Sequence, residues 1–384
     1  MITIYNAKIC TMDTLGTLEN GYLTIKDGKI SDIGEGIPEN GGELYDAKGC
    51  WLLPGFIDGH THLGLLEDSM GFEGDDVNEE SDPATPHLRA IDAINPLERC
   101  FKEAREGGVT CVAAGPGSAN PIGGQFAAIK TDGVRIDNMI LRDPVAMKFA
   151  LGENPKSVYH GKNAAPETRM ATAAIIRENL MKAKKYAEDK HAAENDEDAD
   201  EPEFDMKCEA LLPLMQKKIP AHFHAHRADD IFTAIRIAKE FDLDYTIVHC
   251  TEGYLVKNEL AAEQITAFVG PNLSDRSKPE LKALSFENPV ELDAAGVLIG
   301  LTTDHPVIPL PYLPLCASLC VKAGMSREAA LRAITINPAK ILGIDSRVGS
   351  LVVGKDADLV LSSGDPLDMM NSIEAVFIDG KKVK

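Results

Sequence analysis

The chain has 384 residues, of which 44% are hydrophobic and 26% are charged. Its net charge of −21 favours solubility and argues against nucleic acid or an anionic membrane as the main partner. No apolar run approaches the ~20 residues of a membrane helix, and the N-terminal residues do not resemble a signal peptide. The eight cysteines are scattered, without a C-x-x-C pair. This usage fits a reduced compartment, so we expect a cytoplasmic protein.

The two ends of the chain share a β-rich texture. Residues 1–51 contain short β-prone runs, and Asp27-Gly28 between two of them is typical of a hairpin turn. Similar runs, with a second Asp-Gly turn, occupy residues 351–381. We therefore predict one small β-sandwich domain assembled from residues 1–53 and 346–384.

The middle of the chain, residues 54–345, alternates predicted strands with predicted helices. The expected strands lie at 109–114, 144–151, 219–226, 246–250 and 297–303, and the expected helices at 96–106, 167–190 and 229–241. Ser326 is a candidate N-cap for a later helix, and Gly343 a candidate C-terminal stop for the next one. This repetition predicts a (β/α)₈ TIM barrel. A doubly wound open sheet is the alternative, which the absence of G-x-G-x-x-G after the first middle strand disfavours.

Polar residues fall at the ends of the predicted barrel strands, where a barrel places its chemistry. His60 and His62 end the first strand and project from one face, because side chains alternate along a strand. The other residues of this kind, each on a separate strand, are Lys148, His224, His249 and Asp304.

Each of these residues taken alone has an ordinary structural explanation. A buried histidine is usually hydrogen-bonded within a core, a strand lysine can extend to the rim, and an aspartate after a strand often forms a turn. Their joint occurrence at successive strand ends favours a metal centre, because such a site needs three or more converging ligands.

Three segments then resemble the amidohydrolase superfamily of metal-dependent hydrolases, in particular its imidazolonepropionase-like and prolidase-like members. They are Pro54–His62 at the first barrel strand, Thr303–Pro306 at the eighth, and Gly349–Val360 near the C-terminus, preceded by Asn337–Gly343. The resemblance extends over nearly the whole chain.

The resemblance implies roles for the residues at matching positions. His60 and His62 would bind metal from the first strand, and His224, preferred to His222 and His226, from the fifth. His249 would either bind a second metal or polarise the substrate carbonyl. Asp304 would bind metal and shuttle protons.

The resemblance also implies that Lys148, once carboxylated by CO₂, bridges two metals. Glu153 is a rival for this role, since some members use a glutamate there and some bind one metal. The expected cofactor is therefore one or two divalent ions, zinc by preference.

The implied activity is hydrolysis of a C–N bond other than a peptide bond, in a linear or cyclic amide, by metal-activated hydroxide. Asp304 would transfer the proton to the leaving nitrogen. Deamination of an amino-heterocycle on the same scaffold stays open, as does a non-catalytic binding or assembly role. The expected partner is a small-molecule substrate, and association between copies of the chain stays open.

Substrate contacts are less clearly indicated. The Gly-rich segment 115–125 could bring its backbone close to a ligand, with Asn120 and Gln125 as candidates, although a turn-rich connection explains it equally well. Arg169, Arg227 and His305 are further candidates, and surface ion pairs explain the two arginines as readily. The acidic segment Glu67–Asp82 follows the first strand, so we expect it to lie over the catalytic face.

Overall fold

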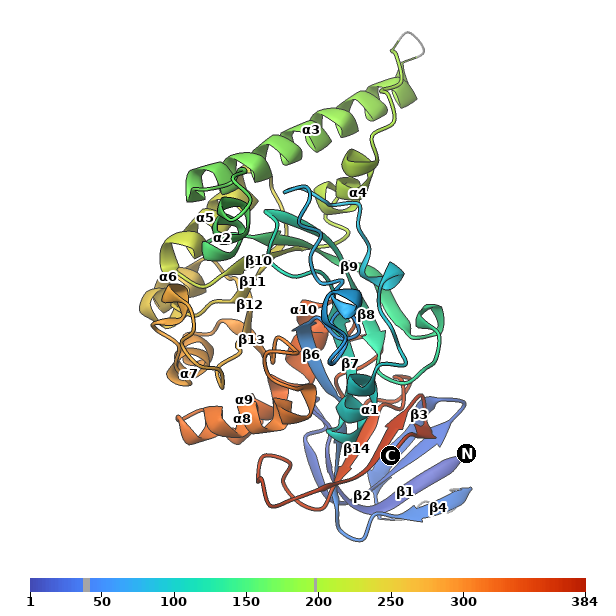
Figure 1. Cartoon of the computed structure of the whole chain (residues 1–384). Coiled ribbons are helices and arrows are strands. Elements are labelled where there is room, and N and C mark those ends of the chain that lie inside the picture. The colour runs from blue at the N-terminus through green and yellow to red at the C-terminus, as the bar shows by residue number, and fades with distance from the viewer. Residues whose placement is uncertain (37–41, 197–198) are drawn as a thin grey trace.

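The computed structural model describes residues 1–36, 42–196 and 199–384. Its strands form two sheets (Figure 1). Residues 37–41 of the predicted N-terminal β region lie outside the described residues.

Both ends of the chain contribute to the first sheet, which has the order β16-β15-β14-β5-β1-β2-β3, with β4 paired to β1. Its strands are β1 (Ile2–Cys10), β2 (Thr17–Lys26), β3 (Lys29–Glu35), β4 (Glu43–Asp46), β5 (Trp51–Pro54), β14 (Leu359–Ser362), β15 (Ile373–Ile378) and β16 (Lys381–Lys382). Strand β14 pairs antiparallel with β5, so the C-terminal segment joins the N-terminal one directly. Strands from both termini therefore share one sheet, whereas the β-sandwich domain and its boundaries at 53 and 346 stay predictions.

The second sheet is a nearly closed barrel with the order β13-β12-β11-β10-β9-β8-β7-β6. Its strands are β6 (Phe56–Thr61), β7 (Val109–Ala114), β8 (Ile122–Lys130), β9 (Ile140–Ala150), β10 (Ala221–Ala225), β11 (Tyr245–His249), β12 (Thr266–Val269) and β13 (Leu298–Leu301). The helices are α1 (Arg99–Glu106), α2 (Glu153–His160), α3 (Arg169–Asn195), α4 (Met206–Met215), α5 (Ala228–Glu240), α6 (Lys257–Ala262), α7 (Glu287–Ala294), α8 (Leu313–Lys322), α9 (Arg327–Arg332) and α10 (Ile336–Ile341).

The barrel departs from strict βα repetition at β8, which runs antiparallel to both β7 and β9. Only residues 115–121 connect β7 to β8. A parallel crossover needs a dozen or more residues, so this short connection can only reverse the chain. The sequence analysis was wrong to treat 115–125 as one loop, because Gly123 and Gly124 lie inside strand β8.

The gap between β6 and β13 is closed by other contacts. Ile57 N donates to Ile334 O at 2.8 Å, and Leu301 N donates to Ala333 O at the same distance, so the residues before α10 bridge the two strands. At the opposite end of the gap, Thr302 Oγ1 donates to the carbonyl oxygen of His60 at 2.6 Å. The two outer strands of the barrel sheet are thereby held in place.

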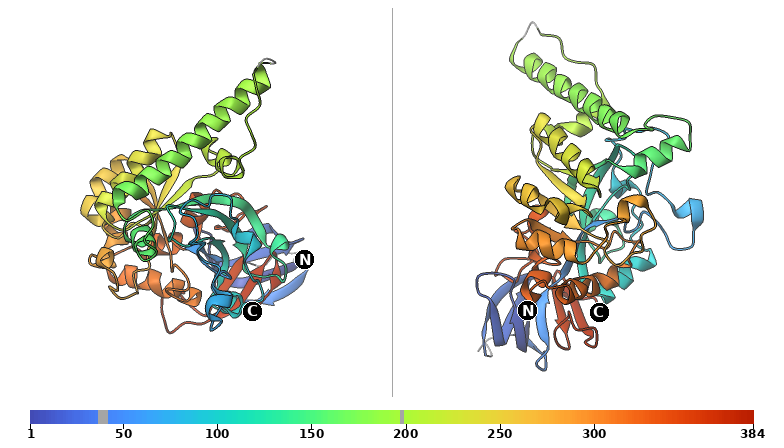
Figure 2. Two further views of the ribbon diagram at one scale, coloured as in Figure 1. Left: turned by 45° about the horizontal axis from the view of Figure 1, so that its top comes forward. Right: turned by 90° about the vertical axis from the view of Figure 1, so that its left-hand side faces the viewer.

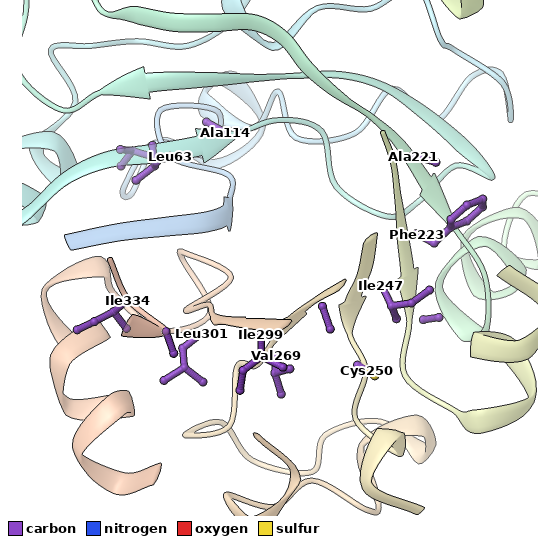
Figure 3. Packing of buried hydrophobic residues seen from close by; sticks show 14 of the residues in the cluster. Leu63, Ala114, Ala221, Phe223, Ile247, Cys250, Val269, Ile299, Leu301 and Ile334 are labelled. Atoms are coloured by element: carbon purple, nitrogen blue, oxygen red, sulfur yellow. The ribbon is translucent and has the colours of Figure 1, made fainter. Parts of the chain in front are cut away.

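Apolar packing covers the outside of the barrel. Figure 3 shows labelled side chains such as Phe223, Ile247 and Leu301 pointing away from the centre of the ring of strands. The neighbouring residues His222 and His224 have the opposite parity on β10, and they pair in register with Lys148 and Val248 on the flanking strands. Alternation along β10 therefore directs its histidines into the barrel.

Helix boundaries follow local signals in several places. Ser326 caps α9 by accepting a hydrogen bond from Ala329 N at 3.1 Å, as predicted. Gly343, with φ of +63°, follows α10, a conformation that favours glycine. The C-terminal part of helix α3 projects from the rest of the molecule (Figure 2). None of the helices in the described ranges is long and apolar enough to cross a membrane.

Candidate metal centre

The predicted polar residues meet at the carboxyl ends of the parallel barrel strands. Strands β6, β9, β10 and β11 carry His60, Lys148, His224 and His249, and Asp304 follows β13. His62 lies one residue beyond β6, and His226 one residue beyond β10. The structure thus brings together all six predicted ligands and adds His226.

The first group of ligand atoms surrounds the Asp304 carboxylate. Its Oδ1 lies 3.3 Å from His62 Nε2 and 3.6 Å from His60 Nε2. Lys148 Nζ lies 3.1 Å from His60 Nε2. Ligand atoms of His60, His249 and Asp304 all lie within 4.8 Å of one another, close enough to share one ion.

Backbone carbonyl groups orient two of the histidines. Nδ1 of His62 lies 2.7 Å from Gly115 O, and Nδ1 of His249 lies 2.7 Å from Gly270 O. A carbonyl oxygen can only accept, so each Nδ1 carries the proton and each Nε2 presents its lone pair to the centre.

The backbone itself is unusual at two of these positions. His249 has φ of +72° and Asp304 has φ of +51°, in the left-handed region that residues other than glycine rarely adopt. On regular strand parity His249 would follow Ile247 to the outside of the barrel. The left-handed turn instead redirects its ring toward His60, with 5.5 Å between the ring centroids. Such strain is concentrated at functional sites.

A buried carboxylate, Asp58, supports this arrangement from beneath. It accepts hydrogen bonds from His60 N at 3.1 Å, Thr303 N at 2.8 Å and Thr303 Oγ1 at 2.7 Å. These bonds tie the residue before Asp304 to the strand that carries His60. Burial raises the pKa of Asp58 to about 6 despite these donors.

A second group of ligand atoms adjoins the first. Ligand atoms of His224, His226 and His249 lie within 4.8 Å of one another. The rings of His226 and His249 stack with 4.5 Å between centroids and an angle of 8° between planes. His249 therefore belongs to both groups.

Burial sets the protonation of these groups. It lowers the pKa of His249 to about 4 and those of His60 and His224 well below the usual value, so the imidazoles are neutral at pH 7. Burial also lowers the pKa of Lys148 to about 7. Burial would raise the pKa of Asp304, but the nearby His249, His62 and Lys148 outweigh it and lower that pKa.

This donor set fits a divalent metal ion. Neutral imidazole nitrogens and an ionised carboxylate are the ligands that zinc prefers. Asp304 Oδ1 is buried and has no hydrogen-bond partner, although a buried carboxylate oxygen normally has one. A cation shared with His60 and His62 would satisfy it.

Two other candidates near the centre are placed differently. His222 lies deeper in the barrel, between the rings of Phe126 and Phe268, and does not join either group. His305 is buried, and its carbonyl oxygen accepts a hydrogen bond from His62 N at 2.8 Å. Its substrate-binding role stays a prediction.

The polar atoms of Asn120 and Gln125 bind other parts of the fold. Asn120 accepts from Tyr159 OH at 2.6 Å and donates to Glu79 O at 2.6 Å. Gln125 Nε2 donates to Pro86 O at 3.4 Å. These contacts favour the structural explanation for both residues.

Both candidate arginines form ion pairs with neighbouring aspartates. Arg169 Nε lies 3.0 Å from Asp230 Oδ1, and Arg227 makes two contacts of 2.9 Å with Asp229. The structure therefore shows ion pairs for both arginines, as the alternative to substrate binding predicted.

The sequence analysis missed Glu280, a carboxylate 1% exposed in the 3₁₀ turn Pro279–Leu281. Its Oε1 lies 3.8 Å from His224 Nε2 and 3.7 Å from His226 Nε2. A glutamate after a proline in a polar connection gives no signal of burial. The rival residue Glu153 donates its backbone N–H to Glu280 Oε2 at 3.0 Å.

The acidic segment after β6 borders a pocket that extends toward the centre. This cavity of about 700 Å³ is lined by residues 75–81, Arg89, Lys162, Pro116 and Gly123, among others. A Cβ on Gly123 would lie 3.3 Å from Lys148 Cγ, so the cavity reaches the strand that covers Lys148.

A further group with metal-ligating side chains, Asp68, Glu98 and Cys100, lies apart from the strand-end histidines in sequence and shares none of their ligands.

Fold and site together define a barrel protein with a histidine and carboxylate centre at its strand ends. The model of the amidohydrolase family matches residues 51–383, and the chain belongs to this family. The family is metal-dependent, and hydrolysis of C–N bonds is the activity that it and the matching proteins support.

Several relatives align over most of the chain. Amidohydrolase tasK of Hapsidospora irregularis is 30% identical over 94% of this chain, which spans 39% of that longer protein. Imidazolonepropionase of Sphingopyxis alaskensis is 25% identical, with 96% of this chain and 93% of that protein covered. A crystal structure of an amidohydrolase from Thermotoga maritima has a TM-score of 0.96 and 43% identity, with 100% of both chains covered. Molinate hydrolase, at 18% identity and a TM-score of 0.62, shares the fold.

Proposed function

We propose that this protein is a metal-dependent hydrolase that cleaves a C–N bond other than a peptide bond in a linear or cyclic amide of a small molecule. The observation that carries the proposal is the convergence of His60, His249 and Asp304 at the barrel strand ends. A scaffold protein has no need to bury these groups together, because each loses hydration without a compensating partner.

The residues that would hold the metal are His60, His62 and Asp304, with His224 and His249 beside them. Zinc suits this set, because imidazole and carboxylate in a closed, buried arrangement are its usual protein ligands. When bound, such an ion lowers the pKa of coordinated water toward ~7 and polarises a carbonyl oxygen.

Asp304 moves the proton in this proposal. The pKa of its carboxyl group lies below the usual value, so the carboxylate is ionised at neutral pH. It can therefore accept a proton from the attacking water and deliver it to the leaving nitrogen. General acid–base catalysis of this kind contributes ~10²–10⁴-fold to the rate.

The orientation of His249 favours one of its two expected roles. Its Nδ1 donates to Gly270 O, and burial lowers its pKa to about 4, so at pH 7 its Nε2 carries no proton. A nitrogen without a proton cannot donate a hydrogen bond to a substrate carbonyl. His249 therefore serves as a ligand in the resting enzyme rather than as a polariser.

Lys148 is placed to carry the carbamate. Its Nζ lies 3.1 Å from His60 Nε2 inside the barrel, and burial lowers its pKa to about 7. An appreciable fraction is then the neutral amine, whose lone pair adds to the carbon of CO₂, with loss of one proton from nitrogen. Enrichment with ¹³C-bicarbonate should give a carbamate resonance in the wild type that Lys148→Met lacks; a resonance retained in that variant refutes this assignment.

The test of the proposed function is a substrate panel with paired product assays. Zinc-loaded protein is incubated with N-acyl amino acids, dipeptides, cyclic imides and amino-heterocycles, and ammonia and new carboxylate are both measured. Carboxylate release from an amide or imide, abolished in Asp304→Asn, supports the proposal. Ammonia release without new carboxylate would instead identify a deaminase, and cleavage of dipeptides alone would overturn the non-peptide specificity.

A further inference from the structure

Lys278 places an ammonium group beside the metal centre, and none of the roles assigned above uses it. The residue lies in the connection between β12 and α7, directly before the 3₁₀ turn Pro279–Leu281. Its side chain is 37% exposed, so a ligand can reach it. Its charge is among the causes that lower the pKa values of His224 and His249, which indicates that the ammonium lies close to the centre.

Asn154, in the first turn of α2, connects this ammonium to the centre. Its Oδ1 accepts a hydrogen bond from Lys278 Nζ at 2.8 Å, and its Nδ2 lies 3.5 Å from His224 Nε2. The same Nδ2 donates to Ser118 Oγ at 2.6 Å. A single carboxamide group therefore spans from Lys278 to a candidate metal ligand, so a substrate held at the centre comes within reach of the ammonium.

The ammonium keeps donors that a ligand can use. A lysine side chain has three N–H donors, and Asn154 takes one of them. Oε1 of Glu280 lies 3.8 Å from Nζ, which is beyond hydrogen-bond distance. Arg169 and Arg227, by contrast, contact their aspartates at 3.0 and 2.9 Å. Lys278 is therefore the cation beside the centre that can still bind a further acceptor.

Glu280 does not shield the ammonium from a ligand. Its side chain is only 1% exposed, and its Oε2 accepts a hydrogen bond from Glu153 N at 3.0 Å. The carboxylate thus lies on the inner side of Lys278, and the accessible side of the pair presents the positive charge.

The acidic cavity near the centre offers an anion less. Asp75 and Asp76 are among its lining residues, and Lys278 is not. Its two cations, Arg89 and Lys162, already pair with carboxylates at 2.6 and 2.9 Å. An anionic group of the substrate would therefore lie at Lys278 rather than in this cavity.

The charge of the ammonium also limits which anion it suits. Lysine binds an anion as a compact point charge, and one such charge balances one carboxylate. A phosphate group carries ~1.5–2 negative charges at neutral pH and would need further cations. A carboxylate is therefore the better match.

We propose that Lys278 determines specificity by binding a carboxylate of the substrate, so that the protein prefers amides with a carboxylate on the carbon next to the scissile nitrogen. This inference rests on the proposed function, because it takes hydrolysis at the metal centre as given. The hydroxyl of Ser118, which accepts from Asn154, can donate its own proton to the same carboxylate. Lys278 thus acts on binding and orientation rather than on bond cleavage.

The test compares matched substrates that differ only in this charge. Zinc-loaded full-length protein is assayed with a panel of N-acetyl-L-amino acids and with the same compounds as C-terminal carboxamides. Wild type should favour the carboxylates in kcat/KM. In Lys278→Met the KM of the carboxylates should rise ~10–100-fold with little change in kcat, because a hydrogen bond to a charged group is lost. The KM of the carboxamides should stay as in wild type.

Two further variants distinguish recognition from a structural role. Lys278→Arg keeps the charge and should keep the preference for carboxylates. Lys282→Met is the matched control and should behave as wild type, because Lys282 belongs to the same connection but is 69% exposed and lies 3.9 Å from Glu252. A purely structural role of Lys278 would change the kinetics of carboxylates and carboxamides alike.

The outcomes separate this inference from the proposed function, which stands or falls with the substrate panel above. Equal kcat/KM for carboxylates and carboxamides, or a preference that survives in Lys278→Met, overturns the inference and leaves the proposed function intact. If neither kind of compound is hydrolysed, calorimetric binding of the N-acetyl-L-amino acids decides. Weaker binding to Lys278→Met than to wild type supports the inference, and equal or undetectable binding overturns it.

Discussion

Replacement of Lys130 by methionine should destabilise the junction between the barrel and the terminal sheet. Lys130 ends β8 with its side chain 5% exposed, and its Nζ contacts Asp356 Oδ2 at 2.8 Å and Asp358 Oδ1 at 3.1 Å. It also contacts Asp379 at the sheet edge. Asp356 and Asp358 follow the segment Gly349–Lys355, which returns from the barrel to the sheet.

The size of the stability loss in Lys130→Met follows from the hydrogen-bond and ion-pair partners that each aspartate keeps. Asp356 retains Lys29 and Arg347, whereas Asp358 retains only the N–H of Asp379 at 2.8 Å. One buried carboxylate is left uncompensated, which costs about 3–5 kcal/mol of unfolding free energy. Urea denaturation measures this loss.

The loss should also depend on pH. Burial raises the pKa of Asp358 to about 6 although Lys130 lowers it, so removal of Lys130 raises that pKa further. A carboxyl whose folded pKa exceeds its unfolded pKa stabilises the fold below the unfolded value, and this contribution is lost as pH rises through the folded one. Asp358 is protonated at pH 4 with or without Lys130. The deficit of Lys130→Met should therefore be smaller at pH 4 than at pH 8.

Lys381→Met is the control, because it removes a lysine charge at an exposed site without disturbing buried carboxylates. Lys381 is 74% exposed and pairs with Asp132 at 3.3 Å, an exposed contact worth ~0–1 kcal/mol. A Lys130→Met variant within ~1 kcal/mol of wild type at pH 8, or one with the larger deficit at pH 4, would refute the reasoning.

Three further substitutions test the site and its support. Asp304→Asn should keep the melting temperature and lose ~10²–10⁴-fold in kcat/KM on the substrate found by the panel; turnover near that of wild type would remove Asp304 from proton transfer. Asp58→Ala should cost at least ~2 kcal/mol in urea denaturation, because it leaves the buried donors of Thr303 unpaired, and an unchanged midpoint would count against this support. Gly59→Ala should cost about 3 kcal/mol or more, because its Cβ would lie 1.9 Å from the Phe268 ring, and normal stability would contradict that packing.

The sequence predicts those parts of the site whose signals are local. His60 and His62 share one strand face, and Asp304 directly follows an apolar strand, so strand periodicity suffices to place them. The helix at 229–241 was predicted within one residue at each end of α5 (Ala228–Glu240), because its apolar stripe repeats with helical spacing.

Features set by tertiary contacts could not be found in this way. Strand β8 was missed because its two glycines resemble a loop, although the entire strand is buried. Glu280 was missed because only the folded chain shows that its connection returns to β10. His226 was set aside because the resemblance favours His224, and its place beside His249 depends on the left-handed backbone at His249.

Zinc-edge anomalous diffraction of crystals grown with Zn²⁺ tests the central claim most directly. We expect an anomalous peak at the strand ends, within ~2.2 Å of Asp304 Oδ1 and of a nitrogen of His60. Zinc bound only at Asp68, Glu98 and Cys100, or no ordered zinc at the strand ends, would contradict it.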